Sequence, residues 1–148
     1  MTWSGGCLCG AVCYRVDAEP KWVSHCYCSM CRKQTGALVG TYVTFPAGTV
    51  NWIGVAPTRY RSSKDVERSF CSKCGETIGS YRVHETTLSA GSLDNPGALP
   101  FDGKRNDHVW CQDRVSWFNT SDDWPRHDRF PPGRDEELDQ LSGQPIRG

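Results

Sequence analysis

The sequence predicts a mainly β fold, and three observations lead to that prediction. Fifteen glycines and nine prolines divide the 148 residues into short segments. These segments are rich in the β-branched and aromatic residues that favour strands. No long amphipathic helix can be read in the body of the chain. The length suits a single domain, and the apolar fraction of 37% indicates a modest core that metal crosslinks would help to stabilise.

Each segment has its own reason to be a strand. Residues 10–16 place apolar side chains at every second position, the spacing of one face of a strand. Residues 38–45 are a run of β-formers. Shorter β-rich stretches follow at residues 50–53, 58–61, 66–70, 77–81, 86–90 and 108–112. Only residues 28–35 suggest a helical turn, which Gly36 would close.

The composition changes from residue 131 onward. Pro131, Pro132 and Gly133 break any regular element. Residues 134–141 could form a short helix, and residues 142–148 are small and polar. We therefore expect a domain over residues 1–130 and a loosely docked or mobile C-terminal tail over residues 131–148.

Charge and hydropathy narrow the classes of function. Seventeen basic residues balance seventeen acidic ones, whereas a protein that relies on phosphate contacts usually carries a basic excess. Nucleic-acid binding is therefore not favoured. The first residues show neither the charged nor the apolar region of a signal peptide. No apolar run approaches the roughly 18 residues that span a bilayer, so we expect a cytoplasmic protein.

Seven of the nine cysteines fall into three clusters. They are the C-x-C of Cys7 and Cys9, the C-x-C-x-x-C of Cys26, Cys28 and Cys31, and the C-x-x-C of Cys71 and Cys74. In a reducing compartment, clustered cysteines favour metal binding over disulfides. Structural zinc usually has four protein ligands, whereas catalytic zinc keeps one position open. The two pairs would make a closed site, and the remaining three cysteines an open one.

The two pairs together predict a structural zinc site. A C-x-C in a strand places both sulfurs on one face, and Gly75 allows the tight turn of the C-x-x-C arm. Such a site would close a loop of about sixty residues and stabilise the domain. The alternative is that these are ordinary buried cysteines.

The three-cysteine cluster suggests a reactive centre. Zinc held by three thiolates could bind an incoming thiol, which the metal deprotonates. His25, Arg32 and Lys33 lie beside the cluster as solvated charges or as groups that steer an anionic thiol. The alternative is a second closed site. Its fourth ligand would then be His25, His84, His108, His127, Cys13 or Cys111. Cys13 and Cys111 are otherwise expected in the core.

With these motifs the chain resembles the glutathione-dependent formaldehyde-activating enzyme family, which includes centromere protein V. The resemblance runs from about residue 5 to residue 131. The residues that support the resemblance are 6–12, 25–33, 35–36, 68–75, 90–94, 108–110 and 116–117. It implies a β-tent of twisted antiparallel sheets. It also implies a structural zinc at Cys7, Cys9, Cys71 and Cys74, and a catalytic zinc at Cys26, Cys28 and Cys31.

The resemblance implies the activity of a carbon–sulfur lyase, which forms or cleaves a carbon–sulfur bond. In the reaction that gives the family its name, glutathione adds to formaldehyde to give S-hydroxymethylglutathione. The carboxylates of glutathione would need cationic partners. The candidates are Arg32, Lys33, Arg59, Arg61 and Arg105. The tryptophans expected in the core or the pocket wall are Trp3, Trp52, Trp110 and Trp117. His108 could lie near the catalytic metal or serve as a structural hydrogen-bonding group.

Two other functions compete with the lyase. One is a non-catalytic zinc module that binds a protein or a nucleic acid, as the centromere relative suggests. The other is a redox enzyme on a related β-tent scaffold, such as a methionine sulfoxide reductase, with Cys111 as nucleophile. The cysteines form no recognisable reductase motif, which places the redox enzyme last.

Overall fold

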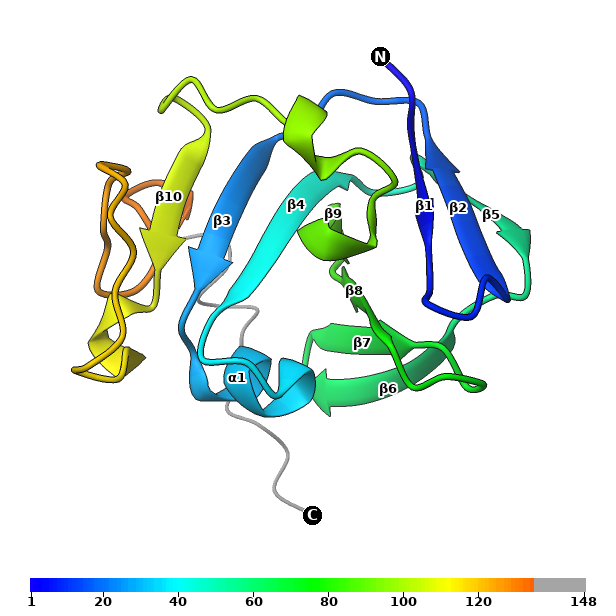
Figure 1. The fold of residues 1–148 in the computed structure, drawn as a ribbon, viewed down its shortest axis with the longest axis horizontal. Helices are drawn as coiled ribbons and strands as arrows, with labels where there is room; N and C mark the ends of the chain where they lie inside the picture. Colours follow the sequence, from blue (N-terminus) through cyan, green and yellow to red (C-terminus); the bar gives the residue numbers. More distant parts are fainter. Residues whose placement is uncertain (135–148) are drawn as a thin grey trace.

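The computed structural model describes residues 1–134, which form two β-sheets and one short helix (Figure 1). The smaller sheet has the strand order β1-β2-β5, and the larger has the order β10-β3-β4-β9-β8-β7-β6. The strands are β1 (Trp3–Gly6), β2 (Val12–Val16), β3 (Trp22–Cys26), β4 (Gly40–Pro46), β5 (Val50–Gly54), β6 (Thr58–Ser63), β7 (Val66–Phe70), β8 (Thr77–Tyr81), β9 (Glu85–Ser89) and β10 (Asn106–Val109). The helix is α1 (Ser29–Thr35), and short 3-10 turns lie at η1 (Ala90–Ser92), η2 (Pro96–Ala98) and η3 (Cys111–Asp113). The predicted mainly β, tent-like fold is confirmed.

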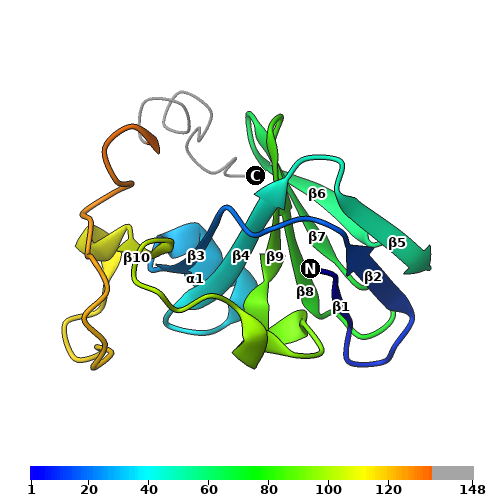
Figure 2. The same cartoon turned by 90° about the horizontal axis from the view of Figure 1, so that it is seen from above.

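Every named pairing is antiparallel except one. β10 runs parallel to β3, with His108 opposite His25 and Val109 opposite Cys26. This register brings the end of β10 to the cysteine at the end of β3. Figure 2 shows β10 and β3 at one side of the molecule, with the three-stranded sheet at the other.

The core lies between the two sheets and joins them. It contains side chains of β1 and β2 packed against side chains of β4, β8 and β9, among them Val12, Val16, Phe45, Ile78 and Leu88. A second, smaller cluster lies at the end of the large sheet beside α1. Its buried members are Cys26, Cys28, Cys31, Tyr42 and Val109.

Two strands, β1 and β3, were not predicted. β1 contains two glycines, which have weak strand propensity, and it forms because it pairs with β2. A side chain at Gly5 would collide with the Ser92 backbone and the Tyr14 hydroxyl, so the close packing there requires glycine. β3 forms because β4 and β10 flank it. The predicted strand at 108–112 ends at Val109, because Trp110 has a φ of 58° and η3 follows.

Some expectations about burial are wrong. Cys13 and Cys111 are only partly buried and belong to neither core cluster. The reason at Cys13 is that it alternates with the buried Val12 and Tyr14 on β2. Trp117 is 76% exposed, because it follows η3 in a loop. Trp3 and Trp52 do pack in or against the core, as predicted.

After η3 the chain returns along β10. The His108 amide donates to the Pro125 carbonyl at 2.8 Å, and the His127 amide donates to the His108 carbonyl at 2.9 Å. Farther on, Arg134 forms an ion pair with Asp107 at 3.1 Å, so the start of the expected tail is docked.

The predicted helix at 134–141 lies almost wholly outside the described residues. Within residues 1–134, no helix is long and apolar enough to cross a membrane.

Candidate metal centres

The sulfurs of Cys7, Cys9, Cys71 and Cys74 lie within 4.8 Å of one another, so this group could hold a metal ion. The Cys9 sulfur is 3.5 Å from that of Cys7 and 3.8 Å from that of Cys71. Tetrahedral zinc with bonds of about 2.3 Å would separate its sulfur ligands by about 3.8 Å. The four sulfurs therefore already have nearly the spacing that tetrahedral zinc requires.

Two glycine turns bring these sulfurs together. Cys7 and Cys9 lie in a turn after β1 and not in a strand, which corrects the expectation that strand alternation aligns them. Gly10 has a φ of 76° and its amide donates to the Cys7 carbonyl at 2.9 Å. Gly75 has a φ of 77° and its amide donates to the Cys71 carbonyl at 2.8 Å. The group thus joins the β1–β2 connection of the small sheet to the β7–β8 connection of the large one.

The sulfurs of Cys26, Cys28 and Cys31 form a second group that could hold a metal ion. Cys26 ends β3, Cys28 is the N-cap of α1, and Cys31 lies in its first turn. The Cys31 amide donates to the Cys28 sulfur at 3.4 Å. Gly36 ends the helix with a φ of 71°, as the sequence predicted. All three side chains are less than 10% exposed, so this group is more deeply buried than the first.

A buried arginine faces this second group. The Arg68 guanidinium lies 3.7 Å from the Cys31 sulfur, and it also donates to Gln34 at 2.6 Å and to Ser62 at 3.1 Å. Burial alone would lower the pKa of Arg68, but the charges of Cys31, Tyr42 and Cys28 and the hydrogen bond to Cys31 together outweigh burial and raise it. Arg32, which was expected to supply a positive charge beside the cysteines, instead donates to the Asp113 carbonyl. The compensating cation comes from β7, which local sequence could not reveal.

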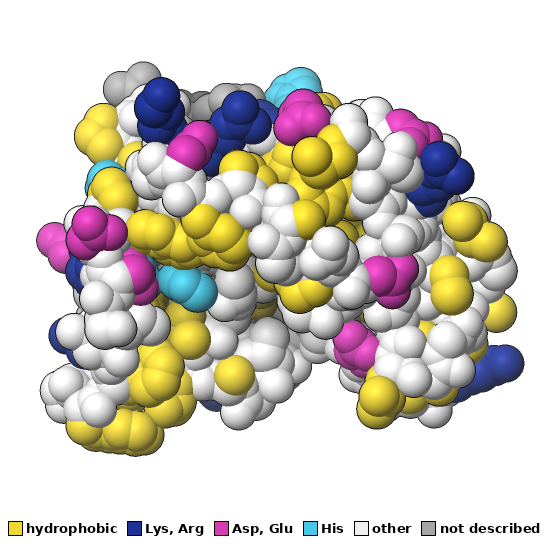
Figure 3. Space-filling view, turned by 45° about the horizontal axis from the view of Figure 1, so that its top comes forward, with side chains coloured by type: hydrophobic (Ala, Val, Ile, Leu, Met, Phe, Trp, Pro, Cys, Tyr) yellow, Lys and Arg dark blue, Asp and Glu magenta, His cyan; other side chains and the backbone are white. Residues whose placement is uncertain are grey.

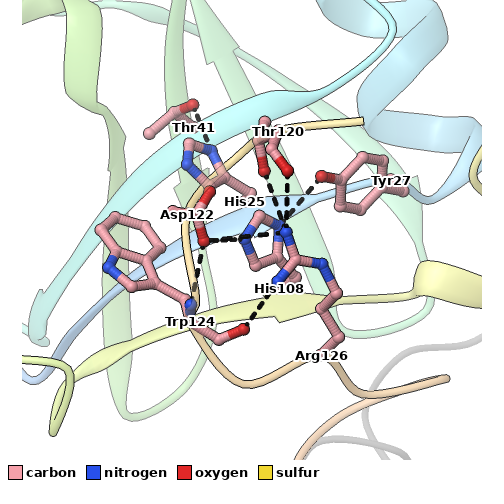
Figure 4. Close-up of polar contacts among 8 residues, drawn as sticks. All are labelled: His25, Tyr27, Thr41, His108, Thr120, Asp122, Trp124 and Arg126. Atoms are coloured by element: carbon pink, nitrogen blue, oxygen red, sulfur yellow. Dashed lines mark hydrogen bonds and ion pairs between the residues drawn. The ribbon is translucent and has the colours of Figure 1, made fainter. Parts of the chain in front are cut away.

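Within residues 1–134, no fourth ligand joins the three cysteines. Among residues 1–134, no other His, Cys, Asp or Glu ligand atom lies within 4.8 Å of all three sulfurs. The candidates for a closed site therefore do not complete it within this part of the chain. Two of them, His25 and His108, instead form a separate group with Asp122 (Figure 4).

The histidine group is held by a network of hydrogen bonds (Figure 4). Fully buried His108 has Nε2 2.7 Å from Asp122 and Nδ1 2.9 Å from the Tyr27 hydroxyl. Burial would raise the pKa of Asp122, but hydrogen bonds from Thr120 and His108 hold it well below its usual value. Tyr27 lies between Cys26 and Cys28 in sequence, so this network fixes the loop that carries two of the sulfurs. His108 therefore has the structural hydrogen-bonding role.

A cavity of about 170 Å³ opens beside the three cysteines. Its apolar wall includes Trp22, Met30, Trp110 and Phe130. Its polar groups include Tyr42 and three arginines, Arg68, Arg82 and Arg134. None of the five cations proposed from sequence lines it. Those five are Arg32, Lys33, Arg59, Arg61 and Arg105. Arg68 lies in β7 and Arg82 follows β8, and the pairing of these two strands brings the arginines together.

Charge is mixed on the outer surface. Figure 3 shows one face on which Lys and Arg side chains alternate with Asp and Glu side chains. Two of the proposed cations are also balanced by an acidic side chain, because Arg59 and Arg61 both pair with Glu67. On this face no extended basic stripe suggests a nucleic-acid partner.

The fold and these sites define a small β protein with two cysteine groups able to hold metal ions. The family model described as glutathione-dependent formaldehyde-activating enzyme matches residues 2–113. The chain therefore belongs to that family.

Two individual proteins are similar to this chain. A Halomonas elongata protein named "Putative glutathione-dependent formaldehyde-activating enzyme" is 33% identical over 88 residues, which cover 53% of this chain and 55% of that relative. The chain thus spans little more than half the length of this curated relative. A crystal structure of a Rhodobacter sphaeroides protein has a TM-score of 0.54 at 23% identity, over 72% of this chain and 99% of that one. This likeness shows a shared fold.

Proposed function

We propose that this protein is a zinc-dependent carbon–sulfur lyase that acts on the adduct of a thiol with formaldehyde, such as S-hydroxymethylglutathione. The observation that carries the proposal is the buried group of Cys26, Cys28 and Cys31. It opens into a cavity and lacks a fourth ligand from residues 1–134. The family name supports the choice of thiol and aldehyde.

In this proposal both cysteine groups hold zinc. Cys7, Cys9, Cys71 and Cys74 would hold a structural ion, because their spacing fits four tetrahedral sulfur ligands. Cys26, Cys28 and Cys31 would hold the catalytic ion, which when bound favours the thiolate form of an incoming thiol. Clustered reduced cysteines and a small thiol substrate fit a cytoplasmic enzyme.

The surrounding residues would balance the charge of the thiolates, orient the aldehyde and exclude water. Arg68 offsets the negative charge of the thiolates through its contact with Cys31. The buried Tyr42 hydroxyl faces the Cys31 sulfur and meets no oxygen or nitrogen partner among residues 1–134, and it would donate to the aldehyde oxygen. The aromatic wall excludes water and holds thiol and aldehyde together, which can lower the barrier by several kcal/mol.

The proposed cleavage conserves atoms and electrons. The carbon–sulfur bond of the adduct breaks, its electron pair stays on sulfur, and a carbon–oxygen double bond forms. The hydroxyl proton leaves the oxygen, and the released thiolate takes up a proton. Formation of the adduct is the same step in reverse, with no oxidant or reductant consumed.

Removing one sulfur tests the proposal. Cys28→Ser should abolish turnover of S-hydroxymethylglutathione while about one zinc per chain remains at the four-cysteine group. Cys111→Ser is a matched control outside both groups, and it should keep both zinc ions and full turnover. Full lyase activity in Cys28→Ser would contradict the proposal. Loss of a reductase activity in Cys111→Ser would favour the redox alternative.

A further inference from the structure

The cavity beside the three cysteines contains three guanidinium groups, and two of them have partners. Arg68 is bonded to Gln34, Ser62 and the Cys31 sulfur. Arg134 pairs with Asp107 at 3.1 Å and lies 4.6 Å from the centre of the Trp22 ring. Neither group is free to take a ligand without breaking contacts that the protein already makes.

Arg82 differs from both. Unlike them, it has no ion pair or side-chain hydrogen bond within residues 1–134. Its Nε, like that of Arg134, is buried and meets no acceptor there. Glu85 lies three residues on, but its carboxylate binds Lys21 at 2.8 Å instead. The remaining contact of the Arg82 guanidinium is with the Phe130 ring, whose centre is 5.7 Å away. The charges of Glu85 and the nearby cysteines offset its burial only in part, and no anion contacts its guanidinium within residues 1–134. Because a desolvated cation without a hydrogen-bonded anion is costly, Arg82 is suited to bind an anion that enters the cavity.

Burial supports the same interpretation. Burial lowers the pKa of Arg82, and the charge of Arg68 lowers it further, while the charges of Glu85, Cys31 and Cys26 offset part of the effect. Two guanidinium groups therefore lie near each other at the wall of one cavity. A carboxylate is the ligand that guanidinium groups bind with the best geometry.

The size of the cavity limits the thiol. Its volume is about 170 Å³, whereas pockets for drug-sized ligands usually measure about 300–1,000 Å³. Bulky side chains of Trp22, Trp110 and Phe130 form its wall. A thiol of a few carbons fits this space better than a tripeptide.

We propose that Arg82 binds the carboxylate of the thiol substrate, and that the cavity selects a short thiol carboxylate over the larger glutathione. The inference rests on the proposed function in one respect: the sulfur of the ligand is taken to lie at the centre formed by Cys26, Cys28 and Cys31. It deepens that function, because it assigns the specificity-determining residue and the substrate class.

Calorimetric titration of the zinc-loaded full chain tests this pairing. The probes are 3-mercaptopropionate, its neutral amide 3-mercaptopropionamide, and glutathione. We expect the acid to bind about 10- to 100-fold more tightly than the amide, the range for a hydrogen bond to a charged group. Glutathione should bind more weakly than the short acid.

Variants test whether Arg82 causes the preference for the acid over the amide. Arg82→Gln should reduce the acid-to-amide ratio to near one, and Arg82→Lys should keep part of it. Arg61→Gln is the matched control, since Arg61 is exposed and pairs with Glu67 outside the cavity, and it should keep the full ratio. The ratio is taken within each variant, so a general weakening cancels.

The outcomes separate this inference from the lyase proposal. A wild-type ratio near one, or an unchanged ratio in Arg82→Gln, would overturn the role of Arg82. Tighter binding of glutathione than of the short acid would overturn the size selection. Calorimetry needs no turnover, so the expected ratios without cleavage of any formaldehyde adduct would leave this inference standing and defeat the lyase proposal alone. Turnover of a formaldehyde adduct without any preference for the acid would support the lyase proposal and overturn this inference.

Discussion

The four-cysteine group makes a quantitative prediction about stability. Changing Cys9 and Cys74 together to serine removes one ligand from each arm and leaves two sulfurs, too few to hold structural zinc. The choice spares packing, because Cys9 is exposed and Cys74 is only partly buried, whereas Cys7 and Cys71 are buried. The stability lost should therefore come mainly from the lost crosslink.

The size of the loss follows from the loop that the metal closes. Cys9 and Cys71 are 62 residues apart in sequence. If a metal crosslink is treated like a covalent one, closing a loop of this length stabilises the fold by about 4 kcal/mol. That is a large share of the roughly 5–15 kcal/mol that holds a domain folded. For a domain of this size it corresponds to a fall in Tm of roughly 10 °C.

Thermal unfolding followed by circular dichroism, with zinc content measured on the same samples, checks the prediction. The control is Cys13→Ser/Cys111→Ser, which also changes two partly buried cysteines but lies outside both groups. We expect the control to keep its zinc and to lose at most a few degrees. An equal loss in both double variants would refute the reasoning, as would an unchanged Tm after zinc is lost from Cys9→Ser/Cys74→Ser.

Three further predictions concern single residues. Asp122→Asn should cost about 1–3 kcal/mol at neutral pH. Because the pKa of Asp122 is lower in the folded chain, this difference should shrink as the pH falls below about 4, as denaturant titrations over pH would show. Gly79→Ala should destabilise by about 2 kcal/mol or more, since its Cβ would collide with the Thr87 backbone, whereas Gly91→Ala, with open space, should be nearly neutral in the same melts. Arg68→Met should weaken zinc at the three-cysteine group about 10- to 100-fold in chelator competition, and equal affinity would contradict its role.

The two cysteine groups could be predicted from the sequence, because the local spacing of the cysteines indicates them. The clusters at residues 7–9, 26–31 and 71–74 do divide into a group of four and a group of three. Most strands were also predictable, because their β-formers lie between glycine and proline breaks. β1 was not, because it is glycine-rich and forms by pairing with β2. β3 was not, because it depends partly on β10, which is distant in sequence.

The cavity could not be predicted in the same way. Its arginines come from β7, from the end of β8 and from beyond β10, and only the strand order brings them to one place. The five cations proposed from sequence therefore include Arg32 and Lys33, which lie beside the cysteines in the chain but do not line the cavity. The Tyr27–His108–Asp122 network was missed for the same reason, since its members are far apart in sequence.

The division of the cysteines into a closed group and an open group can be tested directly. The measurement is the zinc anomalous signal from crystals of the zinc-loaded protein soaked with a thiol. We predict two zinc ions per chain, one enclosed by Cys7, Cys9, Cys71 and Cys74. The other should bind Cys26, Cys28 and Cys31, with the sulfur of the soaked thiol about 2.3 Å away as its fourth ligand. A second zinc closed by a protein ligand and out of reach of the thiol would contradict the account.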